Sequence, residues 1–192
     1  MKAIRSLILC LVALLLTAPL LRAQDLSKYR PFTLGMSMTR VLERTGQKMA
    51  DVKLIHARPA VIQELTWWPP RLAGTSLQSD TVERILCSFY NGELYKISVT
   101  YDQTSTEGLT AEDMVNSISA KYGPATNVAL EIDSSKNDRS DVRQKPVASW
   151  EDSQYSFNLV SSSFTDGLGF TIYSKRVNSE TELAIAEAVK LE

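Results

Sequence analysis

The dipeptide Asn91-Gly92 constrains the fold of this chain more than any other feature of its sequence. Asparagine and glycine adopt positive φ angles readily, and a type I′ turn requires such angles at both of its central residues. The segments on either side, over 82–90 and 93–101, are rich in apolar and β-branched residues, which is typical of strands. The sequence therefore predicts an antiparallel β-hairpin over 82–101.

The register of this hairpin determines which of its side chains face a core. Uninterrupted pairing outward from the turn places Phe89 opposite Leu94 and Leu86 opposite Ile97. On that register apolar side chains gather on one face, which we expect to be the core surface. They are Val82, Leu86, Tyr95, Ile97, Val99 and Tyr101. The second face mixes polar residues with a smaller apolar set, and we expect it to be covered only in part. That set is Ile85, Cys87, Phe89 and Leu94.

Capping residues predict two helices outside the hairpin. The first begins after Ser37 and ends near Gly46, because serine is a favoured N-cap and glycine a favoured C-terminal cap. The second follows Thr110, whose capping box is completed by Asp113, and it stops at Gly123. Apolar residues recur at helical spacing in both segments, which supports the same assignment.

A last helix and several strands complete the expected elements. The helix begins at Asn178 or Ser179 and runs through Leu191. We expect its apolar side to face the core, and that side includes Leu183, Ala186 and Val189. The other segments with strand character are 52–57, 60–68, 127–132, 146–151, 155–162 and 167–175.

The order of these elements predicts an α+β protein in which helices pack against antiparallel sheets. A helix followed by strands occurs twice, over 31–102 and 103–192, which indicates two diverged helix-plus-meander repeats and a C-terminal helix. Both repeats enter their helix through a glycine, at Gly35 and Gly108. We expect a single domain over 24–192, because a chain of this length buries a sufficient core.

The first 23 residues have the three-part layout of a secretory signal. Lys2 and Arg5 precede an apolar run over 7–16, and Ala23 is the residue before the expected cleavage site. The alternative is an uncleaved N-terminal anchor, although the apolar run is shorter than the ~20 residues of a spanning helix. We therefore expect the mature chain in the bacterial periplasm or outside the cell.

The net charge argues against nucleic acid as a partner, and the cysteine content excludes an internal disulfide in the mature chain. The full chain has 21 basic and 22 acidic residues, a net charge of −1. Cleavage removes three basic residues and no acid, so the mature net charge is −4, and nucleic acid is not an expected partner. Cleavage also removes Cys10 and leaves Cys87 alone, without a partner for an internal disulfide.

Residues for familiar catalytic or metal chemistry are sparse. His56 is the single histidine, and no acidic or cysteine residue stands beside it. The polar loop over 133–141 lacks the alternating oxygen ligands and the glycine of a calcium loop. We therefore expect no cofactor, no metal site and no enzymatic activity. The alternative function is a secreted hydrolase or thiol enzyme in which Cys87 and His56 meet in space.

The two helix entries also carry a resemblance to known envelope proteins. In each, a serine or threonine opens a helix, a valine follows, and a glycine ends it. The residues are Gly35, Met36, Ser37, Val41 and Gly46 in the first, and Thr110, Val115, Tyr122, Gly123 and Pro124 in the second. This pattern resembles the small outer-membrane-assembly lipoproteins and the fold of the β-lactamase inhibitor protein. The resemblance implies a secreted, non-enzymatic binding or scaffold protein.

Two adjacent tryptophans mark the candidate binding surface. Trp67 and Trp68 lie on an extended segment, so their side chains point to opposite faces. We expect one ring to be exposed beside the loop over 71–80 and to anchor a partner, with Arg58 and Arg71 as a polar rim. The alternative is that both rings are covered. The expected function is a non-catalytic periplasmic binding or scaffold protein whose partner is another envelope protein or a peptide.

Overall fold

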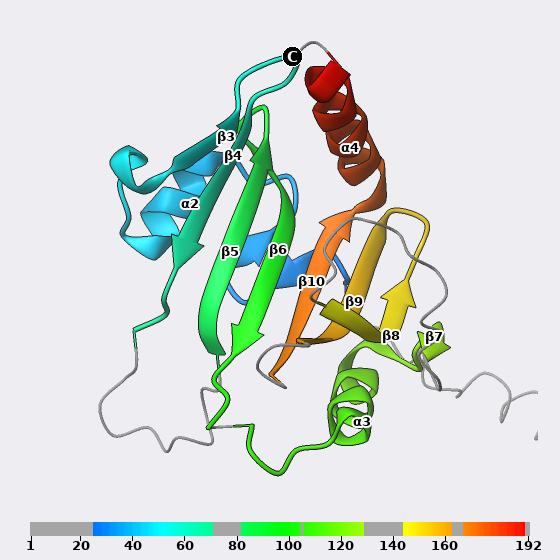
Figure 1. Ribbon diagram of the computed structural model, residues 1–192. Coiled ribbons are helices and arrows are strands. Elements are labelled where there is room, and N and C mark those ends of the chain that lie inside the picture. Colours follow the sequence, from blue (N-terminus) through cyan, green and yellow to red (C-terminus); the bar gives the residue numbers. More distant parts are fainter. Residues whose placement is uncertain (1–24, 71–81, 105, 129–143, 163–166, 191–192) are drawn as a thin grey trace, which may run out of the picture.

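The computed structural model describes residues 25–70, 82–104, 106–128, 144–162 and 167–190, and it has the expected α+β class (Figure 1). These residues form a two-stranded sheet and an antiparallel sheet of eight strands. The strands are β1 (Lys28–Tyr29), β2 (Phe32–Thr33), β3 (Lys53–His56), β4 (Ile62–Trp67), β5 (Val82–Tyr90), β6 (Glu93–Tyr101), β7 (Asn127–Val128), β8 (Gln144–Glu151), β9 (Tyr155–Ser162) and β10 (Leu168–Ser174). The helices are α2 (Met38–Thr45), the short 3-10 helix η1 (Met49–Asp51), α3 (Ala111–Tyr122) and α4 (Lys175–Lys190).

The large sheet consists of two four-stranded meanders joined at their last strands. Its strand order is β3-β4-β5-β6-β10-β9-β8-β7, so β6 of the first meander pairs with β10 of the second. Helix α2 precedes the first meander and α3 precedes the second. The two helix-plus-meander repeats and the C-terminal helix expected from the sequence are therefore confirmed. The β1–β2 hairpin and η1 are additions that the sequence patterns did not predict.

One face of the large sheet carries the hydrophobic core. Two rows of apolar side chains cross six strands, from β4 to β8, at matched register positions. The first row is Leu65, Cys87, Ile97, Ile172, Phe157 and Trp150, and the second is Trp67, Ile85, Val99, Phe170, Leu159 and Ala148. All of them except Trp67 are buried. Burial of a large apolar side chain stabilises a fold by about 1.5–3 kcal/mol, so these rows are the main source of stability.

Helices and the small hairpin pack on this apolar face. Phe32 of β2 meets Trp67 edge to face, with ring centroids 5.6 Å apart. Tyr122 at the end of α3 packs against Phe157, with centroids 5.1 Å apart. Figure 1 shows α2 and the β1–β2 hairpin behind the sheet, and the buried side of α2 belongs to the same core cluster.

The turn of the central hairpin is as expected, but its register is not. Asn91 and Gly92 have φ angles of 50° and 83°, and Phe89 pairs with Leu94. The next pair is Ser88 with Lys96, so Tyr95 is an extra residue on β6 and forms a β-bulge. A bulge of one residue moves the following side chains of the partner strand to the other face. A second register shift, between Val82 and Arg84, returns Val82 to the core face, where it is buried as predicted.

The bulge therefore corrects the predicted core face of β5. Leu86 pairs with Ser98 rather than with Ile97, whose actual partner is Cys87. Ile85 and Cys87 are both completely buried, whereas Leu86 is only half-buried on the opposite face. The physical reason is that the bulge places most apolar residues of both strands, although not Leu86, on one face.

Helix α3 has the predicted capping box. The Thr110 hydroxyl accepts a hydrogen bond from the Asp113 amide at 3.1 Å, and the Asp113 carboxylate accepts one from the Thr110 amide at 2.9 Å. Hydrogen bonds from the Thr110 side chain and backbone lower the pKa of Asp113. At the other end of the helix, the Trp150 indole donates to the Gly123 carbonyl at 2.9 Å. This bond ties α3 to β8.

The expectation for the C-terminal helix is wrong in its start and in its buried side. Helix α4 begins at Lys175, directly after β10, and packs against β10 and β6 at one end of the sheet (Figure 1). Its buried residues are Thr181 and Ala184. The expected core side is exposed instead: Leu183, Ala186 and Val189. The main strand contacts of the helix are with β10 and β6, at one end of the sheet, so that side has little apolar sheet surface to cover.

The other strands begin and end within two residues of the expected bounds. The signal peptide and the loop over 71–80 lie outside the described residues, as do the loop over 133–141 and most of the expected strand over 127–132.

Candidate functional site

The second face of the large sheet, which we name the open face, carries three rows of mostly polar side chains. The rows cross the central strands at matched register positions. The first is Glu64, Ser88, Lys96, Tyr173, Ser156 and Glu151; the second is Thr66, Leu86, Ser98, Thr171, Asn158 and Ser149; the third is Arg84, Thr100, Gly169 and Val160. Most of these side chains are half-buried. Among the described elements, α2, α3 and the β1–β2 hairpin lie on the apolar face, which leaves most of the open face without a helical cover.

Helix α4 reaches this face at one end. The Thr181 hydroxyl and the Tyr95 phenol share a hydrogen bond there, and Glu64 lies near the same phenol. Burial is the main cause that raises the pKa of Tyr95. Among the described elements, the helix therefore covers one end of the open face and does not extend over its central strands.

A groove runs over the accessible part of the open face. Its wider part has a volume of about 590 Å³ and begins at Trp68, and its narrower part has about 230 Å³ and reaches Lys96. Both parts are lined by Arg84, Thr100 and Val160, so they form one continuous depression. We call this depression the groove.

The floor of the groove requires a glycine. Gly169 lines its wider part, on β10 next to β6. A Cβ atom at this position would lie 2.7 Å from the Val99 carbonyl oxygen, closer than side chains approach the backbone. The close approach of β10 to β6 under the groove therefore depends on the absence of a side chain.

Cross-strand hydrogen bonds hold polar side chains of the open face in place. Thr171 Oγ1 donates to Ser98 Oγ at 3.4 Å, and Arg84 Nη2 donates to Thr100 Oγ1 at 3.3 Å. Both contacts are long, which leaves these groups able to exchange partners with a ligand.

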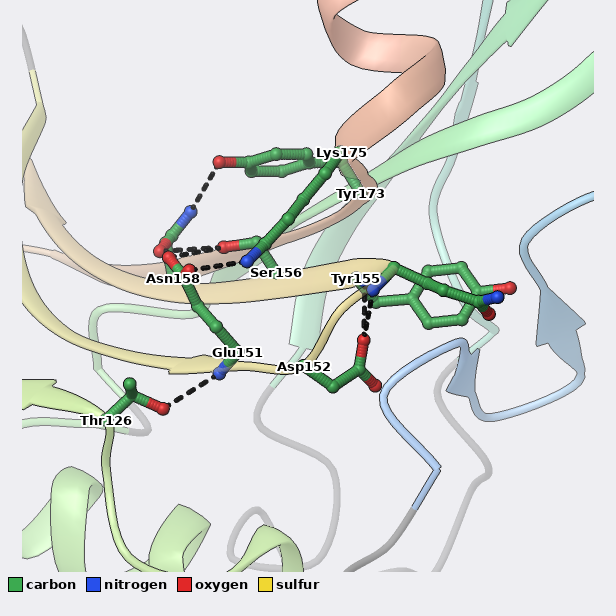
Figure 2. A network of polar contacts seen from close by, with 9 residues as sticks. Thr126, Glu151, Asp152, Tyr155, Ser156, Asn158, Tyr173 and Lys175 are labelled. Atoms are coloured by element: carbon green, nitrogen blue, oxygen red, sulfur yellow. Dashed lines mark hydrogen bonds and ion pairs between the residues drawn. The ribbon is translucent and has the colours of Figure 1, made fainter.

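Polar side chains on the β8–β9 side of the open face also contact one another, and one of these contacts is an ion pair (Figure 2). Lys175 Nζ lies 2.6 Å from the Glu151 carboxylate, and the Ser156 hydroxyl donates to the same carboxylate at 3.2 Å. Asn158 Nδ2 donates to the Tyr173 phenol oxygen at 3.4 Å. The Lys175 ammonium and the Glu151 carboxylate are therefore paired with each other.

The two tryptophans lie in different surroundings. Trp67 belongs to an apolar row and packs on Phe32. Trp68 is 60% exposed and lines the wide end of the groove. The structure thus separates the two rings, with one in the core and one at the groove.

Of the two arginines predicted as a polar rim, only Arg58 lies within the described residues. Arg58 is exposed in the connection before β4, whereas Trp68 follows the last residue of that strand. The six residues of β4 span about 20 Å, so Arg58 does not lie beside Trp68. Arg71 lies outside the described residues. The cation that does line the groove with Trp68 is Arg84.

The pair proposed for the alternative enzymatic function is not brought together. Cys87 is completely buried on β5, and burial raises the pKa of its thiol to about 12, so the nucleophilic thiolate is not formed at neutral pH. His56 lies on the edge strand β3, opposite Ile62, two strands away from Cys87. Strand spacing separates the two residues by more than about 10 Å.

The described ranges contain neither a cluster of metal ligands nor a membrane-spanning helix. In that part of the chain, no three or more His, Cys, Asp or Glu side chains gather closely enough to hold a metal ion. None of the helices described there is long and apolar enough to cross a membrane.

Comparison with known proteins identifies no family. No family model and no curated protein matches the chain. Among solved structures, a cysteine-rich secretory protein from Staphylococcus aureus is similar, with a TM-score of 0.37 and 11% sequence identity. The alignment covers 79% of this chain and 46% of that one, so this chain spans less than half the length of its structural neighbour.

Sequence reasoning missed most residues of the groove. Counted without the bulge, the register of the hairpin places Arg84 on the face predicted to be the core and Lys96, Ser98 and Thr100 on the other face. With Tyr95 taken as an extra residue, every polar position of the two strands outside the bulge sites falls on one face. This grouping of polar residues on one face of the hairpin is the sequence feature that identifies the open face.

Proposed function

We propose that this protein is a non-catalytic binding protein of the bacterial cell envelope, exported by its N-terminal signal, which receives a polypeptide partner on its open face. The observation that carries the proposal is the groove, which has Trp68 exposed at its wide end and polar side chains along its floor. Protein interfaces combine a few aromatic anchors with a polar surround in this way.

The arrangement suits binding better than chemistry. The polar side chains of the groove are hydroxyl groups, two cations and three acids, Glu64, Glu83 and Asp102. Most of them stand on the central strands of a sheet, whose positions are fixed by backbone pairing. A rigid platform of this kind loses little conformational entropy when a partner binds. An exposed tryptophan supplies a large apolar contact that solvent does not satisfy.

Site-specific photocrosslinking tests the proposal in the producing cells. A photoreactive phenylalanine derivative replaces Ser98 on the open face, and the control carries it at the exposed Arg40 of α2, on the other side of the sheet. We expect a discrete crosslinked protein from position 98 and none from position 40. Equal crosslinking from both positions, or none from position 98, would contradict the proposal.

Tryptophan substitutions give a second measurement on the same partner. Trp68→Ala is expected to change the free energy of unfolding by less than about 0.5 kcal/mol, as surface substitutions do. It is expected to weaken partner binding by about 2 kcal/mol, as the loss of an anchor does. Trp67→Ala is the contrast, because removing a packed ring costs about 3 kcal/mol of stability. Unchanged affinity of a folded Trp68→Ala variant would remove Trp68 from the site.

A further inference from the structure

We infer that Asn91 is a site of non-enzymatic deamidation, which the fold protects by holding the asparagine side chain against Val61. The inference concerns a covalent modification of the chain itself, so it goes beyond the proposed function and does not depend on it. It rests on the exposure of the Asn91-Gly92 turn and on the hydrogen bonds of its two central residues.

The sequence makes Asn91 the most reactive asparagine of the chain. Deamidation begins when the backbone nitrogen of the next residue attacks the side-chain carbonyl carbon, and a side chain on that next residue hinders the approach. Asn91 is followed by Gly92, whereas the other five asparagines are followed by larger residues. In the structure Asn91 is exposed, and among the described residues the Gly92 amide has no hydrogen-bond partner. The nucleophile and the water that the reaction needs are therefore both available.

The reaction consumes only water. A base removes the Gly92 amide proton, the amide nitrogen forms a bond to Cγ of Asn91, and the bond from Cγ to Nδ2 breaks as ammonia leaves with a proton from water. The intermediate is a five-membered cyclic imide. Water opens the imide at one of its two carbonyl carbons, which yields aspartate or isoaspartate. In isoaspartate the main chain runs through the side-chain carbon, so it is one carbon longer and no longer fits a two-residue turn.

Hydrogen bonds hold the two reacting residues from opposite sides of the hairpin. Asn91 Oδ1 accepts a hydrogen bond from the Val61 amide at 3.0 Å, and the Asn91 amide donates to the Val61 carbonyl at 2.8 Å. The Gly92 carbonyl accepts from the Met38 amide at 2.9 Å. Val61 lies beside β5, whereas Met38 lies beside β6. The carboxamide of Asn91 is thus directed toward β4 and away from the nucleophile.

The backbone conformation of the turn adds a second restraint. Asn91 and Gly92 have φ angles of 50° and 83°, and Tyr90 pairs with Glu93 on either side of them. This pairing fixes the peptide group between the two central residues. Rotation of the Gly92 nitrogen toward Cγ therefore breaks the last pair of the hairpin, and the imide forms only in molecules whose turn has opened.

Peptide mapping by mass spectrometry tests the protection. Mature protein and a synthetic peptide of residues 88–96 are incubated in the same mildly alkaline buffer, and the fraction of Asn91 converted to aspartate or isoaspartate is followed with time. We expect conversion in the folded protein to be slower than in the peptide by about tenfold or more, because only the open turn reacts. Equal rates, or a peptide that does not convert, would overturn the inference.

A pair of substitutions at Val61 tests the part played by its amide. Proline has no backbone N–H, so V61P removes the bond to Asn91 Oδ1, whereas V61A retains it. Val61 is 37% exposed, so neither change removes a core side chain. In V61P whose fold is confirmed by circular dichroism, we expect Asn91 to convert about fivefold faster than in V61A, the factor for the loss of one typical hydrogen bond. Equal conversion in the two folded variants would overturn the role of Val61.

Hydrogen exchange of the wild-type protein gives a measurement that needs no variant to fold. The Val61 amide exchanges only when its bond to Asn91 opens, so its protection factor and the slowing of deamidation are expected to agree within about threefold. Low concentrations of urea are expected to reduce both together. A well-protected Val61 amide beside an Asn91 that converts as fast as in the peptide would show that the bond does not protect the asparagine, and would overturn the inference.

Discussion

Ile85 and Leu86 are neighbours on β5 that the Tyr95 bulge places on opposite faces of the sheet, and replacing each with alanine tests that register. Both substitutions remove three carbon atoms, so they are matched chemically. Ile85 is completely buried, and at about 0.8 kcal/mol per carbon its loss of burial costs about 2.4 kcal/mol. The remaining cavity raises the total to about 3–4 kcal/mol. Leu86 is half-buried at the groove, where no closed cavity forms, so we expect about 1 kcal/mol.

Urea unfolding of the two variants, followed by tryptophan fluorescence, gives both free energies. The comparison is valid when the dependence on urea concentration is the same for wild type and variants, because the exposed surface is then unchanged. Uninterrupted pairing of β5 with β6 would place Leu86 in the core and Ile85 outside it. A Leu86→Ala variant that loses as much stability as Ile85→Ala, or more, would therefore refute the bulge.

Three further predictions concern the turn, the response to acid and the N-terminus. Gly92→Ala is expected to cost about 1 kcal/mol of stability in thermal or urea unfolding, because the residue has a φ angle of 83° that alanine adopts with strain. Hydrogen bonds from Ser27 and the ammonium of Lys28 lower the pKa of Asp25 to about 2, so its contribution to stability is present above its usual pKa of 3.8 and is lost as pH falls toward 2. Acid titration of Asp25→Asn should lack that component, and a stability curve identical to wild type would contradict it. N-terminal sequencing of exported protein should begin at or next to Gln24, whereas intact Met1 in a membrane fraction would contradict cleavage.

Local signals in the sequence predicted local structure well. The Asn91-Gly92 turn and the Thr110 capping box each depend on residues close in sequence, and both are present. The repeated helix-plus-meander order also follows from neighbouring elements, since successive strands of a meander pair with each other.

Features that depend on contacts between residues far apart in the sequence could not be predicted from the local pattern. An extra residue such as Tyr95 leaves the alternation of a strand almost unchanged, so the pattern alone does not show which later side chains change face. The exposed side of α4 follows from its place at one end of the sheet, which depends on how the two meanders meet. Arg58 is close to Trp68 in sequence but is separated from it by the length of β4.

The seam between β6 and β10 has a consequence for the order in which the chain folds. Within each meander, pairing strands follow one another closely along the chain, whereas the seam pairs Ile97 with Ile172, 75 residues away. Closing so long a loop is entropically costly, so the seam forms after its two halves. Until then β6 is an unprotected sheet edge with an apolar row, able to pair with another unfinished chain. A chaperone that shields β6 until β10 arrives would therefore raise the yield of folded protein more than one that acts on either outer edge.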